Sequence, residues 1–161
     1  MKLSDFIELM SKNKSCYLAQ EDMQAFKDLK ENYDFYDLIP SSNHNQDNVF
    51  INLWMRANTR SGLHFDTLDN FLVQIYGTKK VVLIPPEDAA FVYPIPYNFS
   101  KCYVNQFEPN FKKFPKFKKA RIFEGDLKPG DVLFIPRGWY HYIYSPTINF
   151  FKLLVWLPFN I

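Results

Sequence analysis

The sequence predicts a mainly β fold, a sandwich or barrel with one or two helices packed outside it. Aromatic residues make up 19% of the 161 residues, whereas the chain has only five glycines. Aromatic and β-branched side chains pack well on a pleated surface, which favours strands over a helical bundle. From residue 49 onward, short apolar runs alternate with turns that contain proline or glycine, and this punctuation is typical of all-β domains.

The first forty residues are instead predicted to be helical. Apolar residues recur there at helical spacing in two stripes, Leu3, Phe6, Ile7 and Met10 and then Met23, Phe26 and Leu29. Ser4 is placed to cap the first helix, and residues 41–48 form a polar loop that separates the helical part from the strands.

Six strands are predicted after this loop. They span residues 49–56, 71–76, 79–84, 131–135, 139–144 and 148–156. Gly77-Thr78 separates the second strand from the third by two residues, which predicts a tight hairpin. Pro85-Pro86 ends the third strand. Residues 94–117 form a proline-rich excursion without regular periodicity.

Hydropathy and cysteine content exclude several classes of protein. No stretch approaches about 18 uncharged apolar residues, so no transmembrane helix is predicted. Asp5 and Glu8 lie where a signal peptide needs its apolar region. Cys16 and Cys102 are too few for a disulfide framework and too isolated for a CxxC zinc site. We therefore expect a cytoplasmic protein with reduced thiols and no membrane partner.

The formal net charge of +2 is unevenly distributed. Residues 111–121 contain no acid, and their cations are Lys112, Lys113, Lys116, Lys118, Lys119 and Arg121. Such a run attracts phosphates or an acidic partner. A solvated lysine-rich loop around Pro115 explains the run about equally well, so both interpretations stay open.

The candidate for chemistry is an HxD motif formed by His64 and Asp66. Side chains at i and i+2 of a strand point to the same face, so one extended tripeptide offers an imidazole and a carboxylate to one metal ion. His141, on an apolar strand, would complete a 2-His-1-carboxylate triad for non-haem Fe(II). HxD alone is common by chance, and a histidine on an aromatic strand is more often a hydrogen-bonded core residue. His44, in the polar loop, is expected at the surface.

The sequence around these residues resembles the JmjC-type domains of the cupin superfamily. The resemblance extends over most of residues 15–157, and its main motifs are HFDTLDNFLVQIYGTKKVVLIPPEDAAFVY from residue 64 and GDVLFIPRGWYHYI from residue 130. The strongest likeness is to the asparaginyl hydroxylase of hypoxia-inducible factor, through YLAQ, YPIP and FPKF. A second likeness is to the tRNA hydroxylase of wybutosine synthesis.

The resemblance implies a double-stranded β-helix, the jelly-roll barrel of cupins. We expect a single domain over residues 1–161, with a helical preface at residues 1–40 and the barrel at residues 49–157. It also implies that this domain binds Fe(II) as its metal and takes 2-oxoglutarate and O2 as cosubstrates.

Site residues follow from the same resemblance. His64, Asp66 and His141 match the family's iron ligands and catalytic centre. The residues that match contacts to 2-oxoglutarate are Tyr17, Ser61, Asn70 and Lys79, with Lys79 pairing with the distal carboxylate. Without the resemblance, Lys79 would be predicted to face solvent, whereas a buried cation needs an anion beside it.

Two departures from the family pattern concern ligand binding. Leu154 stands where the family has an asparagine when the last strand is aligned on Trp156, so one polar contact to the cosubstrate is missing. Residues 97–103 show no counterpart of the Arg/Gln pair with which the asparaginyl hydroxylase holds its target amide. Asparagine is therefore not predicted as the target.

The function implied is hydroxylation of a macromolecule, coupled to decarboxylation of 2-oxoglutarate to succinate. A protein side chain is the first expected substrate, because the likeness at residues 93–117 favours the asparaginyl hydroxylase. A tRNA base of the wybutosine type is the alternative, which the lysine run supports. A non-catalytic cupin-like module that binds a metal or ligand is an alternative from another class. A histone demethylase is less favoured, because the sequence shows no reader domain or zinc cluster.

Overall fold

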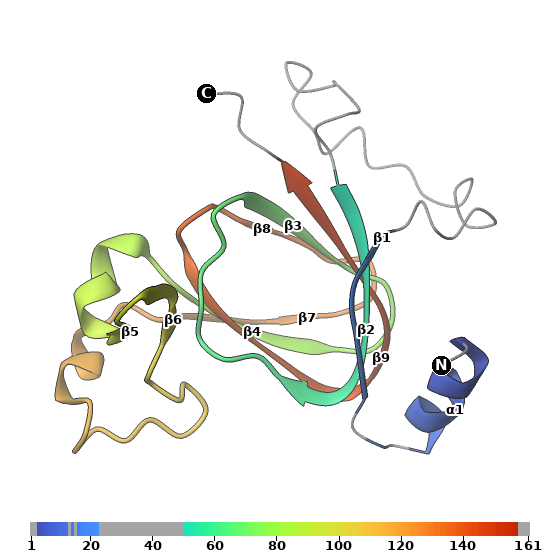
Figure 1. The fold of residues 1–161 in the computed structure, drawn as a ribbon, viewed down its shortest axis with the longest axis horizontal. Coiled ribbons are helices and arrows are strands. Elements are labelled where there is room, and N and C mark those ends of the chain that lie inside the picture. The colour runs from blue at the N-terminus through green and yellow to red at the C-terminus, as the bar shows by residue number, and fades with distance from the viewer. Residues whose placement is uncertain (1–2, 13, 15, 23–49, 158–161) are drawn as a thin grey trace.

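The computed structural model describes residues 3–12, 14, 16–22 and 50–157. Within these residues there is one α-helix, α1 (Leu3–Ser11), together with two short 3-10 helices, η6 (Pro86–Phe91) and η7 (Pro115–Lys119). The strands are β1 (Cys16–Asp22), β2 (Phe50–Arg60), β3 (Asp69–Gln74), β4 (Lys79–Ile84), β5 (Pro94–Ile95), β6 (Asn98–Cys102), β7 (Phe123–Leu127), β8 (Val132–Ile135) and β9 (Tyr140–Leu157). The predicted mainly β class is confirmed (Figure 1).

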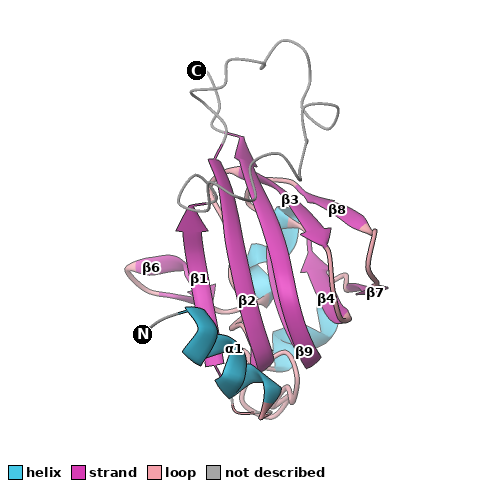
Figure 2. Ribbon diagram, turned by 90° about the vertical axis from the view of Figure 1, so that its right-hand side faces the viewer, coloured by secondary structure: helices cyan, strands magenta, loops and turns pink. Residues whose placement is uncertain are grey.

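Two long antiparallel strands, β2 and β9, organise the sheet. They pair from Phe50 opposite Trp156 to Arg60 opposite Tyr144. β1 pairs with the other edge of β2, whereas the other edge of β9 carries both β3 and β4. β8 pairs with β3 and β7 pairs with β4, so the strands curl round into a barrel (Figure 1, Figure 2). The aromatic and branched residues of β9 suit this extended backbone.

β3 and β4 do not form the predicted hairpin. β3 is antiparallel to residues 152–157 of β9, and β4 is antiparallel to residues 140–144 of the same strand. The two strands therefore follow each other in one direction along the same edge of β9. Gly77, with φ of 78°, bends the chain between them without reversing it. The hairpin is prevented because the remaining edges of β3 and β4 pair with β8 and β7.

The helical preface predicted for residues 1–40 is only partly correct. α1 confirms the first predicted helix, which lies against the sheet (Figure 2). Phe6 and Met10 of its apolar stripe are buried against β2, whereas Ile7 is 41% exposed. Residues 16–22 are strand β1 instead of helix, because their backbone groups hydrogen-bond along the edge of β2. The second stripe, the polar loop and His44 lie outside the described residues.

The strands beyond residue 90 differ from the prediction in two ways. The predicted strands at 139–144 and 148–156 form one continuous strand, β9. Strands β5, β6 and β7 lie in segments for which no strand was predicted. β6 and β7 have the sequences NFSKC and FEGDL and bury little, so they lack the apolar alternation from which a half-buried strand is recognised.

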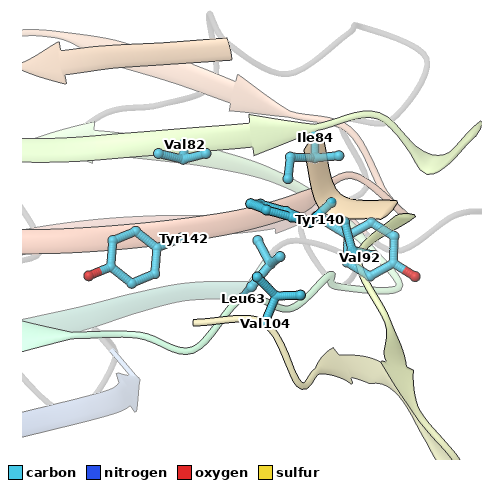
Figure 3. Packing of buried hydrophobic residues seen from close by; sticks show 8 residues of the cluster. Leu63, Val82, Ile84, Val92, Val104, Tyr140 and Tyr142 are labelled. Carbon is cyan, nitrogen blue, oxygen red and sulfur yellow. The ribbon is translucent and has the colours of Figure 1, made fainter. Parts of the chain in front are cut away.

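The excursion between β4 and β7 packs on the outer face of the barrel. Figure 3 shows the cluster that holds it there, whose fully buried members are Leu63, Val82, Ile84, Val92, Val104, Phe117, Tyr140 and Tyr142. Phe117 anchors η7 in this cluster and is only 1% exposed. Asp88, in η6, accepts three hydrogen bonds from Arg121. One cation of the basic run is therefore committed to an ion pair.

The two faces of the strands carry different side chains. Val82 and Ile84 of β4 belong to the outer cluster, whereas Val81 packs inside the barrel with Leu72 and Ile143. Side chains alternate along a strand, so residues two apart share a face. By this alternation, the buried polar side chains of the described strands have the parity of the interior, and they are Arg56, Asn70, Gln74, Lys79, His141 and Ser145.

Candidate functional site

The HxD motif lies in the segment that follows β2, and not within a strand as the spacing predicted. His64 forms an isolated antiparallel bridge with His141, whose backbone N–H and C=O both bond to those of His64 at 2.6 and 3.1 Å. The backbone carbonyl of Asp66 accepts a hydrogen bond from Gly138 at 2.9 Å. These bonds fasten the motif to the beginning of β9.

His141 is thereby brought from a distant part of the chain to His64 and Asp66. One ligand atom from each residue lies within 4.8 Å of the others. Nε2 of His141 is 3.5 Å from Oδ2 of Asp66, and the two imidazole ring centroids are 4.3 Å apart. His141 is buried and the other two side chains are half-buried, so the cluster has one accessible side.

Backbone carbonyls orient both imidazole rings. Nδ1 of His64 is 2.8 Å from the carbonyl oxygen of Gly62, and Nδ1 of His141 is 3.1 Å from that of Trp139. A carbonyl only accepts, so each Nδ1 carries the proton and donates it. The lone pair is then on Nε2, the form in which a histidine binds a metal.

The carboxylate of the cluster is held by Asn70. Nδ2 of this residue donates to Oδ2 of Asp66 at 2.9 Å. Asn70 is 1% exposed, and its own Oδ1 is buried without a hydrogen-bond partner. The structure thus places Asn70, predicted to contact 2-oxoglutarate, directly behind a metal-ligand candidate, with one polar atom left for a further donor.

The donor set fits iron. Two neutral imidazole nitrogens and one carboxylate oxygen form the 2-His-1-carboxylate set of non-haem Fe(II) sites. Hydrogen bonds that orient each ligand are the usual supports of such sites, and all three residues have one here.

A buried cation lies deeper in the barrel. Lys79, at the start of β4, is 0% exposed, and its Nζ donates to Oγ of Ser145 at 3.1 Å. Among the described residues, no carboxylate pairs with it. Burial and the positive charge of Arg56 lower the pKa of Lys79 to about 7. An anion that binds beside the Lys79 ammonium group would stabilise its charged form.

Arg56 adds a second buried cation to the interior. The residue is 3% exposed and lies directly opposite Tyr17 in the pairing of β1 with β2. Its Nη2 donates to the Tyr17 hydroxyl at 2.9 Å, and its guanidinium lies 4.6 Å from the centre of the Tyr17 ring. Burial lowers the pKa of Arg56, and Tyr17 partly offsets this effect.

Two other predicted positions have different surroundings. Oγ of Ser61 accepts a hydrogen bond from the backbone N–H of Ile143 at 2.8 Å. The hydroxyl bonded to Lys79 is instead that of Ser145. Leu154 pairs with Asn52 and Leu72 through the β9 backbone, and its side chain lies outside the described residues.

Residues 1–157 match the model of the family described as a cupin-like domain. The chain belongs to this family. The match covers nearly the whole chain and confirms the cupin-superfamily membership that the motifs predicted.

Three curated proteins illustrate the relatives of this cupin-like domain. HSPB1-associated protein 1 of Bos taurus is 42% identical over 99 residues, covering 58% of this chain and 20% of that protein. tRNA wybutosine-synthesizing protein 5 of Mus musculus is 40% identical over 94 residues, covering 58% and 29%. Lysine-specific demethylase 8 of Xenopus tropicalis is 34% identical over 165 residues, covering 97% and 37%. The chain thus spans between a fifth and two fifths of the length of these relatives.

Similarity to solved structures is lower. An oxalate decarboxylase variant of Bacillus subtilis is 19% identical with a TM-score of 0.43, over 68% of this cupin-like domain and 21% of that chain. In the part of the chain that the structure describes, every helix is too short or too polar to cross a membrane.

Sequence reasoning missed Arg56 and Ser145 in this cupin-like domain. Both have a signal in strand alternation. Ser145 follows His141 by four positions on β9, so the two share a face. Arg56 lies between Met55 and Ala57, which pack toward α1, so its own side chain has to point into the barrel. A lone cation between two apolar neighbours on a strand is the pattern to look for.

The pKa of Lys79 predicts a pH dependence of stability. Its value of about 7 in the folded protein lies below its usual 10.5, so between these pH values the unfolded chain binds more protons. The free energy of unfolding therefore increases as the pH rises from 7 towards 10. Urea unfolding of the ligand-free protein measures this increase, with Lys79→Met as the reference that lacks the titrating ammonium group. Parallel pH profiles of the two proteins would contradict the prediction.

Proposed function

We propose that this cupin-like domain is an Fe(II)- and 2-oxoglutarate-dependent oxygenase that hydroxylates a macromolecular substrate, in the first place a protein side chain. The observation that carries the proposal is the combination of two features in one barrel. A three-residue cluster with the donor set for Fe(II) stands at its accessible end, and an uncompensated cation stands inside it.

His64, Asp66 and His141 would hold the metal, with both rings oriented through Nδ1. When bound, Fe(II) supplies the redox chemistry that couples decarboxylation of 2-oxoglutarate to hydroxylation. Asn70 fixes one carboxylate oxygen of Asp66, which limits how that ligand can rotate.

The rest of the barrel serves the cosubstrate. Lys79 would bind the distal carboxylate of 2-oxoglutarate, and Ser145 holds its ammonium group in place from β9. Leu72, Val81 and Ile143 line the interior with apolar surface, which excludes water from the charged groups. Exclusion of water strengthens the attraction between the cation and a bound carboxylate.

Anaerobic loading tests the proposal directly. The purified protein is saturated with Fe(II), and 2-oxoglutarate is then added while the visible spectrum is recorded. A metal-to-ligand charge-transfer band is expected, because it requires both molecules at one site. A protein that binds one Fe(II) and shows no band with 2-oxoglutarate would instead be a non-catalytic metal-binding module.

A tRNA substrate is the second candidate, supported by one relative's name and by the basic run. The lysines of this run are all exposed, and they are Lys112, Lys113, Lys116, Lys118 and Lys119. They lie in and before η7, which Phe117 holds against the outer cluster. An array of fixed surface cations of this kind suits contacts to phosphates.

Salt dependence separates the two substrates. If tRNA binds through this run, the double variant Lys116→Glu/Lys118→Glu is expected to weaken binding and to reduce the slope of log K against log salt by about 1.4. The matched control is Lys12→Glu/Lys14→Glu, which changes the net charge equally at exposed sites beside α1. Equal effects of the two variants, or a shallow slope for the wild-type protein, would remove the tRNA candidate.

A further inference from the structure

We propose that Arg56 is a second cationic contact for the acidic cosubstrate, so that the distal carboxylate is held between Arg56 on β2 and Lys79 on β4. The inference rests on the proposed function and extends it to a residue of the interior that the family motif does not include. It also makes Tyr17 a positioning residue for the guanidinium, through the hydrogen bond from Nη2 to its hydroxyl.

The two buried cations have more hydrogen-bond donors than described partners. A guanidinium has five N–H donors and an ammonium has three. The described contacts of Arg56 use one donor on Tyr17, and its buried Nε has no partner. Those of Lys79 use one donor on Ser145. Both acceptors are neutral hydroxyls, so most donors and both positive charges remain uncompensated.

Arg56 and Lys79 also lie near each other inside the barrel. Arg56 and Lys79 are on strands that flank β9 on its two edges, and both side chains point into the barrel. They are close enough for the charge of Arg56 to depress the pKa of Lys79. Two like charges buried near each other destabilise the free protein, and an anion placed between them removes this cost.

A carboxylate suits a guanidinium beside an ammonium group. A guanidinium presents a planar fork that matches the two oxygens of a carboxylate, whereas an ammonium acts as a point charge. Tyr17 and Trp54 lie beside the guanidinium at 4.6 and 5.7 Å from their ring centres. These rings restrict its movement, so the fork is ready before the ligand arrives.

The test compares two ligands that differ only in the distal group, 2-oxoglutarate and 2-oxopentanoate. Calorimetry is performed on the Fe(II)-loaded protein without oxygen, with wild type, Arg56→Met, Arg56→Lys and Arg60→Met. Arg60 is the matched control, since it is an exposed cation on the same strand that stacks on Phe107.

Arg56→Met is expected to weaken 2-oxoglutarate binding by about tenfold or more. Its affinity for 2-oxopentanoate should be unchanged, because that ligand has no carboxylate for Arg56 to hold. Arg56→Lys keeps the charge without the fork and should weaken 2-oxoglutarate by a smaller factor. Arg60→Met should bind both ligands like the wild type.

Two outcomes would overturn the inference. If Arg56→Met and Arg56→Lys lose affinity equally for both ligands, Arg56 only supports the fold. If both variants bind 2-oxoglutarate with the wild-type affinity, Arg56 has no part in binding. The proposed function fails separately, if Fe(II)-loaded wild-type protein binds no 2-oxoglutarate. Arg56→Lys keeps the experiment decisive if Arg56→Met does not fold.

Discussion

Replacing Asp66 with alanine is expected to abolish iron-dependent formation of succinate from 2-oxoglutarate. The substitution removes the only anionic member of the triad and leaves two imidazoles without a carboxylate beside them. Loss of a residue that merely supports a metal ligand costs about 10- to 100-fold in affinity or activity. Loss of the ligand itself should exceed this range, so no turnover above background is expected.

Two further variants make the result specific. Thr67→Ala, at the exposed neighbour of Asp66, should leave metal content and turnover unchanged. Asn70→Ala keeps the ligand and removes its hydrogen bond, so an intermediate loss of about 10- to 100-fold is expected. Metal content by mass spectrometry and succinate by chromatography measure the series. Full turnover in Asp66→Ala, with iron bound, would contradict the assignment of the triad.

Lys79→Met is expected to stabilise the ligand-free protein while it removes 2-oxoglutarate binding. Lys79 is wholly buried beside another cation and has no anionic partner among the described residues. Replacing a buried ion pair with apolar groups of similar size is often neutral or stabilises a protein by about 1–4 kcal/mol, and Lys79 lacks even the attraction of a partner. Methionine fills similar space with a flexible apolar chain. An increase of this size is expected at pH 6, where Lys79 is mainly protonated.

The two readouts of this variant move in opposite directions, which separates function from folding. Chemical unfolding measures the increase in stability, and calorimetry on Fe(II)-loaded protein measures the loss of affinity. The control is Lys80→Met, at the neighbouring exposed lysine on the outer face of β4, which should change neither by much. A destabilised Lys79→Met that still binds 2-oxoglutarate would show that Lys79 has a structural role alone.

The outline of the fold could be predicted because its signals are local. Phe6 and Met10 lie on one face of a helix by spacing alone, and that helix is present. The run KKVVLI is apolar, branched and ended by two prolines, and β4 has the predicted bounds. Such signals depend on the backbone conformation of a few consecutive residues, which a sequence specifies directly.

Local sequence signals did not predict which strands pair with each other. Gly77 suits a hairpin turn and also a bend that continues in one direction, because a positive φ is needed in both. The chain bends without forming a hairpin because β7, β8 and β9 pair with the edges of β3 and β4. β1 became a strand for a similar reason, since the edge of β2 supplied hydrogen-bond partners for its backbone.

The candidate site also has features that the sequence determined and features that only the tertiary structure decided. The sequence by itself determined the chemical types, two imidazoles and a carboxylate in recognisable motifs and a lysine at a matching position. Only the tertiary structure brought His141 to the HxD motif, turned each Nδ1 toward a carbonyl, and buried Lys79 and Arg56 in one interior. The physical reason is that burial and charge proximity arise between residues distant in the chain. A lysine or arginine on a strand looks the same in the sequence whether its side chain faces water or the interior of the barrel.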